Sequence, residues 1–114
     1  MVSIPASPTG ITLDDAFSSP VRLKICGYLA GCDEADFQAV IAYCELTAPS
    51  LSKNITALNA KGYLDIRKVA SGRYTKTRLS ITDTGRAALR SHVGSLQMIA
   101  DAARLFSIVG QQPS

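Results

Sequence analysis

Along most of the chain, apolar residues recur every three or four positions, which is the spacing that places them on one face of an α-helix. This spacing predicts three short helices: residues 20–30, a second from about residue 33 or 34 to 44, and a third over 48–61. Between residues 63 and 81 apolar and polar positions alternate instead, which predicts two β-strands joined by a turn at residues 70–73. The helical spacing then returns and predicts a long last helix that reaches about residue 109.

Residues that favour helix ends support these boundaries. Ser19 and Thr47 are suited to start the first and third helices, because a hydroxyl can accept a hydrogen bond from a free backbone N–H. Asp33 and Glu34 suit the positive end of the second helix, so we expect them in its first turn. Gly31 is a suitable end for the first helix.

The order of elements predicts an α+β fold that is mainly α-helical. Residues 45–47 form a three-residue turn between the second and third helices, which is typical of a helix-turn-helix. The two-stranded hairpin that follows at once makes a winged helix-turn-helix the expected architecture. In that arrangement the helix after the turn enters the major groove of duplex DNA.

Charge is distributed unevenly along the chain, although the formal net charge is only +3. Residues 1–46 hold six acidic and two basic side chains, whereas residues 47–90 hold nine basic and two acidic ones, which gives this second part nine minus two, or +7. A positive zone of this kind favours a polyanionic partner. A solvated basic surface is the alternative interpretation of the charge alone.

The third helix has an outward face that suits close approach to DNA. With Leu51, Ile55 and Leu58 turned inward, the remaining side chains are small or polar and none is acidic. The face carries no Arg or Gln for bidentate contacts, which argues against strong base discrimination; an ordinary polar helix surface is the alternative. The residues of this helix that we expect to contact DNA are Pro49, Ser50, Ser52, Lys53, Asn54 and Thr56.

The hairpin supplies cations that can neutralise phosphates, and an Arg at its tip can enter a narrow minor groove. A hairpin whose lysines only protect an exposed strand edge is the alternative. The hairpin residues that we expect to contact DNA are Arg67, Lys68, Arg73, Tyr74, Lys76 and Arg78.

Two segments resemble a known family. Thr47 to Ile66, TAPSLSKNITALNAKGYLDI, is similar to the recognition helix and first wing strand of MarR/ArsR-like winged-helix regulators. Arg73 to Leu89, RYTKTRLSITDTGRAAL, resembles their returning wing strand and the start of the next helix, and the likeness covers residues 13–100. The resemblance implies a homodimer that binds double-stranded DNA at an operator and usually represses transcription.

The long last helix carries apolar residues at spacings of four and three, which indicates a packing seam. We expect this helix to pair with its counterpart in a second copy of the chain, with packing inside one chain as the alternative. The expected organisation is a flexible arm over 1–11, a winged helix-turn-helix domain over 12–90, and a dimerisation helix and tail over 91–114. The expected seam residues are Leu89, Val93, Leu96, Ala100, Ala103 and Phe106.

Residues that could carry other chemistry are few. Cys26 and Cys44 lie on apolar helix faces and are expected to be buried, and Cys32 has no neighbour that would activate it. His92 is expected to be a solvated helix residue. We therefore expect no metal site, no cofactor and no redox switch.

Several classes of function are disfavoured. The chain lacks a phosphate-binding glycine loop, GxSxG and HExxH, so we expect a protein that is not an enzyme. Without a signal peptide or an apolar run long enough to span a bilayer, the expected location is the cytoplasm and no membrane partner is expected. A winged-helix module that binds another protein is the alternative function, and a small-molecule effector is neither supported nor excluded.

Overall fold

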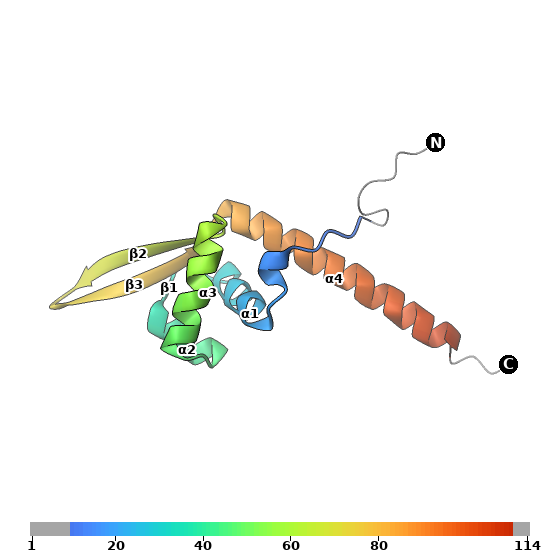
Figure 1. The fold of residues 1–114 in the computed structure, drawn as a ribbon, viewed down its shortest axis with the longest axis horizontal. Helices are drawn as coiled ribbons and strands as arrows, with labels where there is room; N and C mark the ends of the chain where they lie inside the picture. Colours follow the sequence, from blue (N-terminus) through green and yellow to red (C-terminus); the bar gives the residue numbers. More distant parts are fainter. Residues whose placement is uncertain (1–9, 111–114) are drawn as a thin grey trace.

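A computed structural model describes residues 10–110 of the chain, and the side chains of residues 10–104. Figure 1 shows three short helices packed together, with a β-hairpin projecting at one end of the molecule and a long helix projecting at the other. The elements are η1 (Asp15–Phe17), α1 (Pro20–Ala30), β1 (Ala35–Asp36), α2 (Phe37–Cys44), α3 (Ala48–Ala60), β2 (Leu64–Ser71), β3 (Tyr74–Ile81) and α4 (Asp83–Gly110).

The expected helix starts are confirmed by hydrogen bonds from backbone N–H groups to capping hydroxyls. Ser19 Oγ accepts from the N–H of Arg22 at 3.4 Å, and Thr47 Oγ1 accepts from the N–H of Ser50 at 3.2 Å. Thr82 Oγ1 in the same way accepts from the N–H of Gly85 at 2.9 Å. These bonds satisfy donors that have no partner inside the helix.

The expected start of the second helix was wrong, because α2 begins only at Phe37. Ala35 and Asp36 instead form the short strand β1, which pairs antiparallel with β3 in a sheet of order β1-β3-β2. The backbone of these residues gains partners on the edge of β3, and Ala35 becomes buried in the core. Glu34 and Asp36 consequently face the cations of the hairpin instead of capping a helix.

The core lies between the three short helices and the inner ends of β2 and β3. Leu51, Ile55 and Leu58 of α3 are all buried, as expected, and they pack with residues such as Ile25 and Leu79. Each fully buried side chain of this size contributes about 1.5–3 kcal/mol relative to its exposed state. The packing therefore fixes which face of α3 is left for solvent.

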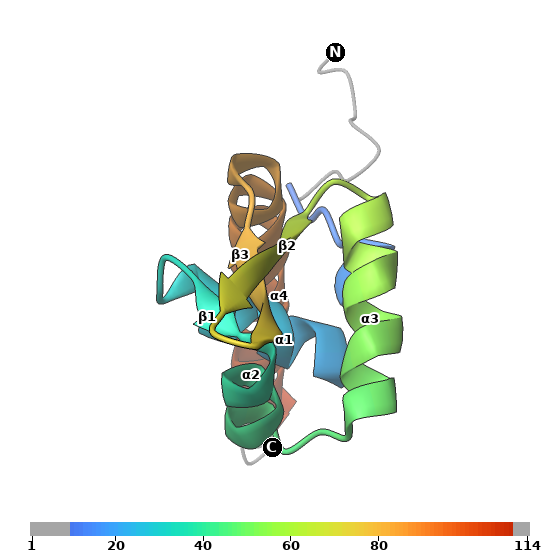
Figure 2. The same ribbon diagram turned by 90° about the vertical axis from the view of Figure 1, so that its left-hand side faces the viewer.

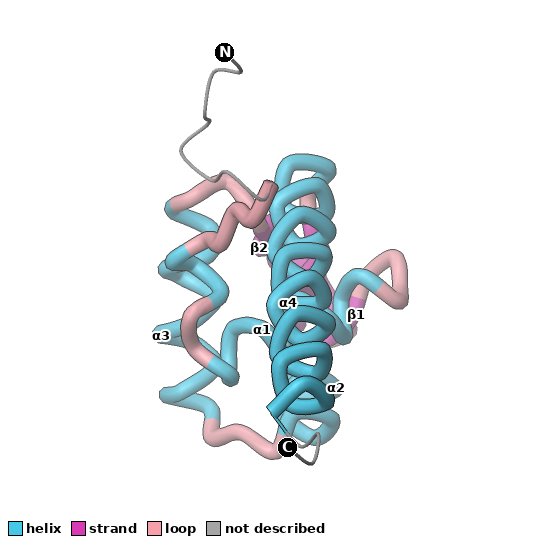
Figure 3. Tube along the Cα trace, turned by 90° about the vertical axis from the view of Figure 1, so that its right-hand side faces the viewer, coloured by secondary structure: helices cyan, strands magenta, loops and turns pink. Residues whose placement is uncertain are grey.

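Helix α4 divides into a packed first part and a projecting second part. Leu89 is only 8% exposed and belongs to the core of its own chain, so we remove it from the expected dimer seam. Val93 and Leu96 remain 48% and 37% exposed, while the side chain of Phe106 lies outside the described residues. Figure 3 looks along α4 from the end that carries the C-terminus. Neither α4 nor any other helix within residues 10–110 combines the length and apolar character that crossing a membrane requires.

The corner between α3 and β2 is attached to the start of α4. The carbonyl oxygen of Tyr63 accepts a hydrogen bond from the N–H of Thr82 at 2.9 Å. Gly85 lies against the same carbonyl, and a Cβ at this position would be 2.3 Å from the Tyr63 oxygen. Arg86, in the next position, donates from Nη1 to the carbonyl of Ala30 at 2.7 Å and so joins α4 to the end of α1.

Candidate nucleic-acid interface

The outward face of α3 is open to solvent. Ser52, Lys53 and Thr56 are exposed and Ser50 is half-buried, so this face is not covered by any described part of the chain. The Thr56 hydroxyl donates to the carbonyl of Ser52 at 2.8 Å. Its oxygen keeps acceptor capacity, and the Lys53 ammonium is free to reach a phosphate or a base edge.

Asn54, one of the residues that we expected to contact DNA, has a structural use in this arrangement. Its Oδ1 accepts from Nε of Arg22 at 3.0 Å, and its Nδ2 donates to the carbonyl of Ser50 at 2.8 Å. Both ends of the amide are therefore occupied, and the side chain joins α3 to the start of α1. Asn59 is engaged in a similar way, since its Nδ2 donates to the carbonyl of Leu64 at 2.8 Å.

The tip of the hairpin presents one exposed cation beside an exposed aromatic ring. Gly72 adopts a φ of 62°, a conformation that glycine reaches without steric cost and that a two-residue hairpin turn requires. The turn leaves Arg73 exposed and Tyr74 with 77% of its surface accessible. Lys68 lies farther back, where its Nζ donates to Thr77 Oγ1 at 2.9 Å across the two strands.

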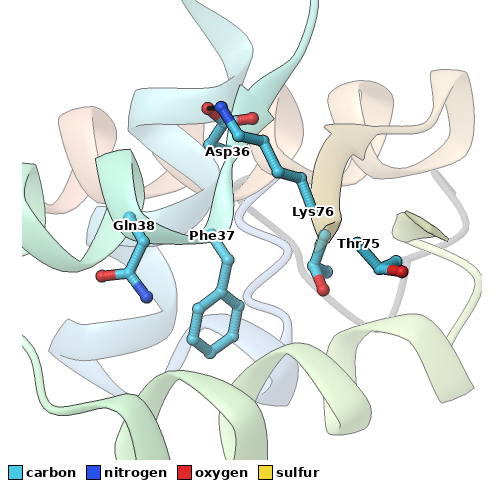
Figure 4. Close-up of a pocket in the computed structure, with 6 residues that line it drawn as sticks. Asp36, Phe37, Gln38, Thr75 and Lys76 are labelled. Atoms are coloured by element: carbon cyan, nitrogen blue, oxygen red, sulfur yellow. Dashed lines mark ion pairs between the residues drawn. The ribbon is translucent and has the colours of Figure 1, made fainter. Parts of the chain in front are cut away.

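The middle of the hairpin, beside β1, carries an ion-paired cluster that combines three cations with two carboxylates. Arg67 pairs with Glu34, and Arg78 bridges Glu34 at 3.2 Å and Asp36 at 2.7 Å. Lys76 Nζ lies 3.9 Å from Asp36 Oδ2, and Figure 4 shows its side chain reaching toward that carboxylate. A hollow of about 230 Å³ adjoins this pair between the start of α2 and β3, and Figure 4 shows the residues that line it.

These ion pairs change the ionisation of the groups that form them. The hydrogen bond from Arg67 is the main reason that the pKa of Glu34 lies below its usual range, and Arg78 lowers it further. The hydrogen bond to Asp36 raises the pKa of Arg78. Glu34 is thus charged at neutral pH, and both carboxylates occupy cations that could otherwise contact DNA phosphates.

The positive zone is consequently smaller than the sequence indicates. Of the expected DNA-contacting cations, the three in this cluster are already paired within the chain. Within residues 10–104, Lys53, Lys68 and Arg73 form no ion pair and keep their full charge. Glu34 and Asp36 are distant from the hairpin in sequence, which is why charge counting along the chain missed them.

The third helix and the hairpin occupy the same end of the molecule. Figure 2 views this end and shows α3 beside the hairpin, which projects toward the viewer. A helix that follows a three-residue turn, with an exposed polar face and a cationic hairpin next to it, defines a winged helix-turn-helix protein. Residues 21–100 match the winged helix DNA-binding domain family, and the chain belongs to this family.

Proteins of known and unknown role are similar to this chain. An uncharacterized protein of Methanocaldococcus jannaschii is 32% identical over 78 residues, which cover 68% of this chain and 84% of that one. The structure of a transcriptional regulator homologue from Pyrococcus horikoshii OT3 superposes with a TM-score of 0.76 at 27% identity, covering 83% of this chain and 94% of that one. The chain is thus a winged-helix DNA-binding transcriptional regulator.

More distant structures show the same fold. Bacillus subtilis PadR, solved in complex with operator DNA, has a TM-score of 0.60 at 17% identity and covers 66% of this chain and 48% of its own. A MarR family regulator of Silicibacter pomeroyi, SPO1453, has a TM-score of 0.55 at 21% identity, with 82% of this chain and 64% of that one covered. The expected MarR-like winged-helix architecture is confirmed.

Two side chains of α4 have a role that the sequence did not reveal. We expected His92 to be solvated, but this was wrong. Its side chain is only 5% exposed, because the segment before α1 folds over it. Its Nδ1 accepts from the N–H of Asp14 at 3.0 Å, and its ring lies 5.3 Å from that of Phe17. Ser95, one turn farther on, is 2% exposed and bonds to the backbone of Thr12.

The cysteines are placed as expected. Cys26 and Cys44 are fully buried, and burial raises the pKa of Cys26 to about 12. Burial also raises the pKa of Cys44. Cys32 is half-buried, and its thiol donates to the carbonyl of Tyr28 at 3.4 Å.

Proposed function

We propose that the chain binds duplex DNA as a homodimer with sequence preference, and that each copy places α3 in the major groove. The observation that carries this proposal is the uncovered face of Ser52, Lys53 and Thr56, which lies at the same end of the molecule as the exposed Arg73. In this arrangement Lys53 contacts a base edge or a phosphate, and Arg73 with Tyr74 reaches the flanking backbone or the minor groove.

The projecting part of α4 supports the homodimer. Exposed apolar side chains gather along it, among them Val93, Leu96 and Ile99, and apolar surface in such a concentration favours a protein partner. A second copy related by two-fold symmetry would bury this surface and present two recognition helices about 34 Å apart, which is one turn of the duplex. The seam that we propose is Val93, Leu96, Ala100 and Ala103, with Phe106 retained from the sequence prediction.

Repression is the regulatory effect that this arrangement favours. A dimer with its recognition helices in successive major grooves covers about two turns of one duplex face, and polymerase cannot occupy the same site. Reporter transcription from a promoter that contains the bound sequence is expected to fall when the protein is expressed. An increase in transcription would show an activator instead.

The DNA-binding proposal is tested by selecting bound fragments from random duplex DNA and then measuring affinity against salt. Each phosphate contact lowers the slope of log affinity against log salt by about 0.9. Lys53→Ala and Arg73→Ala are each expected to weaken binding and to make the slope shallower, while both proteins remain folded. Arg104→Ala, on the far part of α4, is the matched control that removes a cation without an effect.

Two results would contradict this interface. Equal affinity of the parent and both interface variants would mean that α3 and the hairpin tip do not contact the duplex. Affinity that does not respond to salt would favour a winged-helix module that binds another protein.

The dimer is tested by light scattering. The parent is expected to have twice the chain mass of 12.1 kDa, and Leu96→Asp is expected to return it to the single value, because burial of an unpaired carboxylate opposes association. Ser91→Asp introduces the same charge at an exposed position away from the seam and is expected to leave the dimer intact. A dimer that persists in Leu96→Asp would place the interface elsewhere.

A further inference from the structure

The segment before α1 lies across the molecule and contacts two elements that are distant from each other in sequence. We call residues 12–17 the strap. At its beginning, Ser95 Oγ of α4 accepts from the N–H of Thr12 at 2.7 Å and donates to the Thr12 carbonyl at 3.1 Å. Two residues later, the N–H of Asp14 donates to Nδ1 of His92 at 3.0 Å. The strap is thus bonded to one side of α4 over a full helical turn.

The side chain of Asp14 points to the opposite partner, the corner where α3 ends and β2 begins. Its Oδ2 accepts from the Tyr63 hydroxyl, and Lys61 Nζ lies 3.8 Å from its Oδ1. The same Oδ1 also accepts from the N–H of Ala16 at 2.8 Å and caps η1. The ring of Phe17 stacks on that of Tyr63, with centroids 5.6 Å apart and planes inclined by 12°.

The ionised form of Asp14 is the one that these contacts require. Burial of the carboxyl opposes ionisation, but the hydrogen bonds from Tyr63 and from the N–H of Ala16, together with the charge of Lys61, outweigh it and lower the pKa. Each donor around Asp14 therefore faces an acceptor that is charged at neutral pH.

With the strap in place, the corner at Tyr63 is held to α4 at two points. The first is the start of the helix, where Thr82 and Gly85 meet the Tyr63 carbonyl. The second is the pair His92 and Ser95, about 15 Å farther along the helix at 1.5 Å per residue. Arg86 and the buried Leu89 also hold the first part of α4, and the second attachment, through the strap, adds a restraint on the direction of the helix relative to α3.

We propose that the strap is a brace that sets the angle between the dimerisation helix and the recognition helix, with Asp14 as its positioning residue. This inference rests on the proposed DNA-binding homodimer. A tilt of about 9° at the corner shifts a point about 22 Å along α4 by roughly 3.4 Å, which is the rise of one base pair. The brace therefore determines which spacing between half-sites the dimer accepts.

The experiment compares affinities for the duplex recovered by selection and for versions with one base pair added or removed at its centre. The parent is expected to prefer the selected spacing at least tenfold. Tyr63→Phe, which keeps the ring stack on Phe17 and removes only the hydroxyl, and Asp14→Ala are expected to reduce this preference to threefold or less. Affinity for an isolated half-site is expected to change by less than twofold.

Two further variants separate a positioning role from a general loss of structure. Asp14→Asn keeps only one of the two carboxylate oxygens, so it preserves only one of the bonds from Ala16 and Tyr63 and is expected to give a spacing preference between those of the parent and Asp14→Ala. Asp15→Ala removes the neighbouring exposed carboxylate, outside the network, and is expected to behave as the parent does. A parent-like preference in both Tyr63→Phe and Asp14→Ala overturns the brace.

Failure of the brace and failure of the proposed function give different results. A parent that binds no selected duplex overturns the proposed function, and the brace is then judged without DNA. For that purpose spin labels are placed at residues 53 and 101, and the labelled chain is diluted into unlabelled chain so that only distances within one chain are seen. A distance distribution at least twofold broader in Tyr63→Phe than in the parent supports the brace, and identical distributions refute it.

Discussion

Removal of the two carboxylates that pair with the cations of the hairpin is expected to strengthen DNA binding. Glu34→Gln with Asp36→Asn keeps the size of both side chains and leaves Arg67, Arg78 and Lys76 without their ion-pair partners. The freed cations project from β2 and β3, beside the exposed tip that we propose to contact the DNA backbone. DNA phosphates can then bind these cations without first breaking an ion pair within the chain.

The size of the effect follows from the number of cations released. If two of them per protomer each neutralise one further phosphate, a dimer gains four contacts, and the slope of log affinity against log salt steepens by about 3.6. Between 50 and 200 mM salt, the double variant then loses roughly 150-fold more affinity than the parent does. At the low-salt end it is expected to bind more tightly than the parent to selected and random duplexes alike, since phosphate contacts carry no sequence information.

The assay is fluorescence anisotropy on a labelled duplex over that range of salt. Asp33→Asn with Asp65→Asn is the matched control, because it changes the formal charge by the same amount at two exposed carboxylates that form no ion pair within residues 10–104. Equal slopes for the double variant and this control would refute the competition between carboxylates and phosphates. Weaker binding at every salt concentration with an unchanged slope would also refute it, and would show that Glu34 and Asp36 are needed to hold the hairpin in place.

Three further outcomes are expected. Gly85→Ala would place a Cβ 2.3 Å from the carbonyl oxygen of Tyr63. It is expected to lower the free energy of unfolding by about 3 kcal/mol or more, which would be measured as a melting temperature at least ~12 °C lower. Gly94→Ala is the control, because its Cβ would meet open space, and it is expected to be neutral or slightly stabilising. Ellman's reagent is expected to titrate one thiol in the folded chain, that of Cys32, and three after unfolding; rapid reaction of all three would contradict the burial of the other two. The pKa of Asp14 in the folded chain lies below its ordinary value of 3.8. The stability that its charge contributes is therefore present above pH 3.8 and is lost as the pH falls through the lower folded pKa. The melting temperature of Asp14→Asn is accordingly expected to fall less on acidification than that of the parent.

Local signals were sufficient to predict most of the fold. The hydroxyls of Ser19 and Thr47 cap the helices that they were expected to cap, since an N-cap depends only on groups within three residues. The alternation of Leu79 and Ile81 with polar neighbours likewise identified the inner face of β3. These predictions succeeded because the relevant partners are close in sequence.

Contacts between distant segments could not be predicted in the same way. Glu34 was assigned to a helix start because its acidity suits a helix dipole, but the guanidinium groups of Arg67 and Arg78 are stronger partners and lie more than thirty residues away in the chain. His92 has polar neighbours along α4, and its burial arises only because the strap crosses it. Asn54 lies on the expected face of α3, yet Arg22 of α1 occupies its carbonyl oxygen.

The hairpin has eight-residue strands, but only Leu64, Leu79 and Ile81 of these strands are buried. Its outer part is held mainly by the hydrogen bonds between β2 and β3, so substitutions there remove little packing energy. The charges and side chains that we propose to contact DNA can therefore change without endangering the folded domain. Proteins with one shared core can in this way differ in how strongly their hairpins bind the DNA backbone.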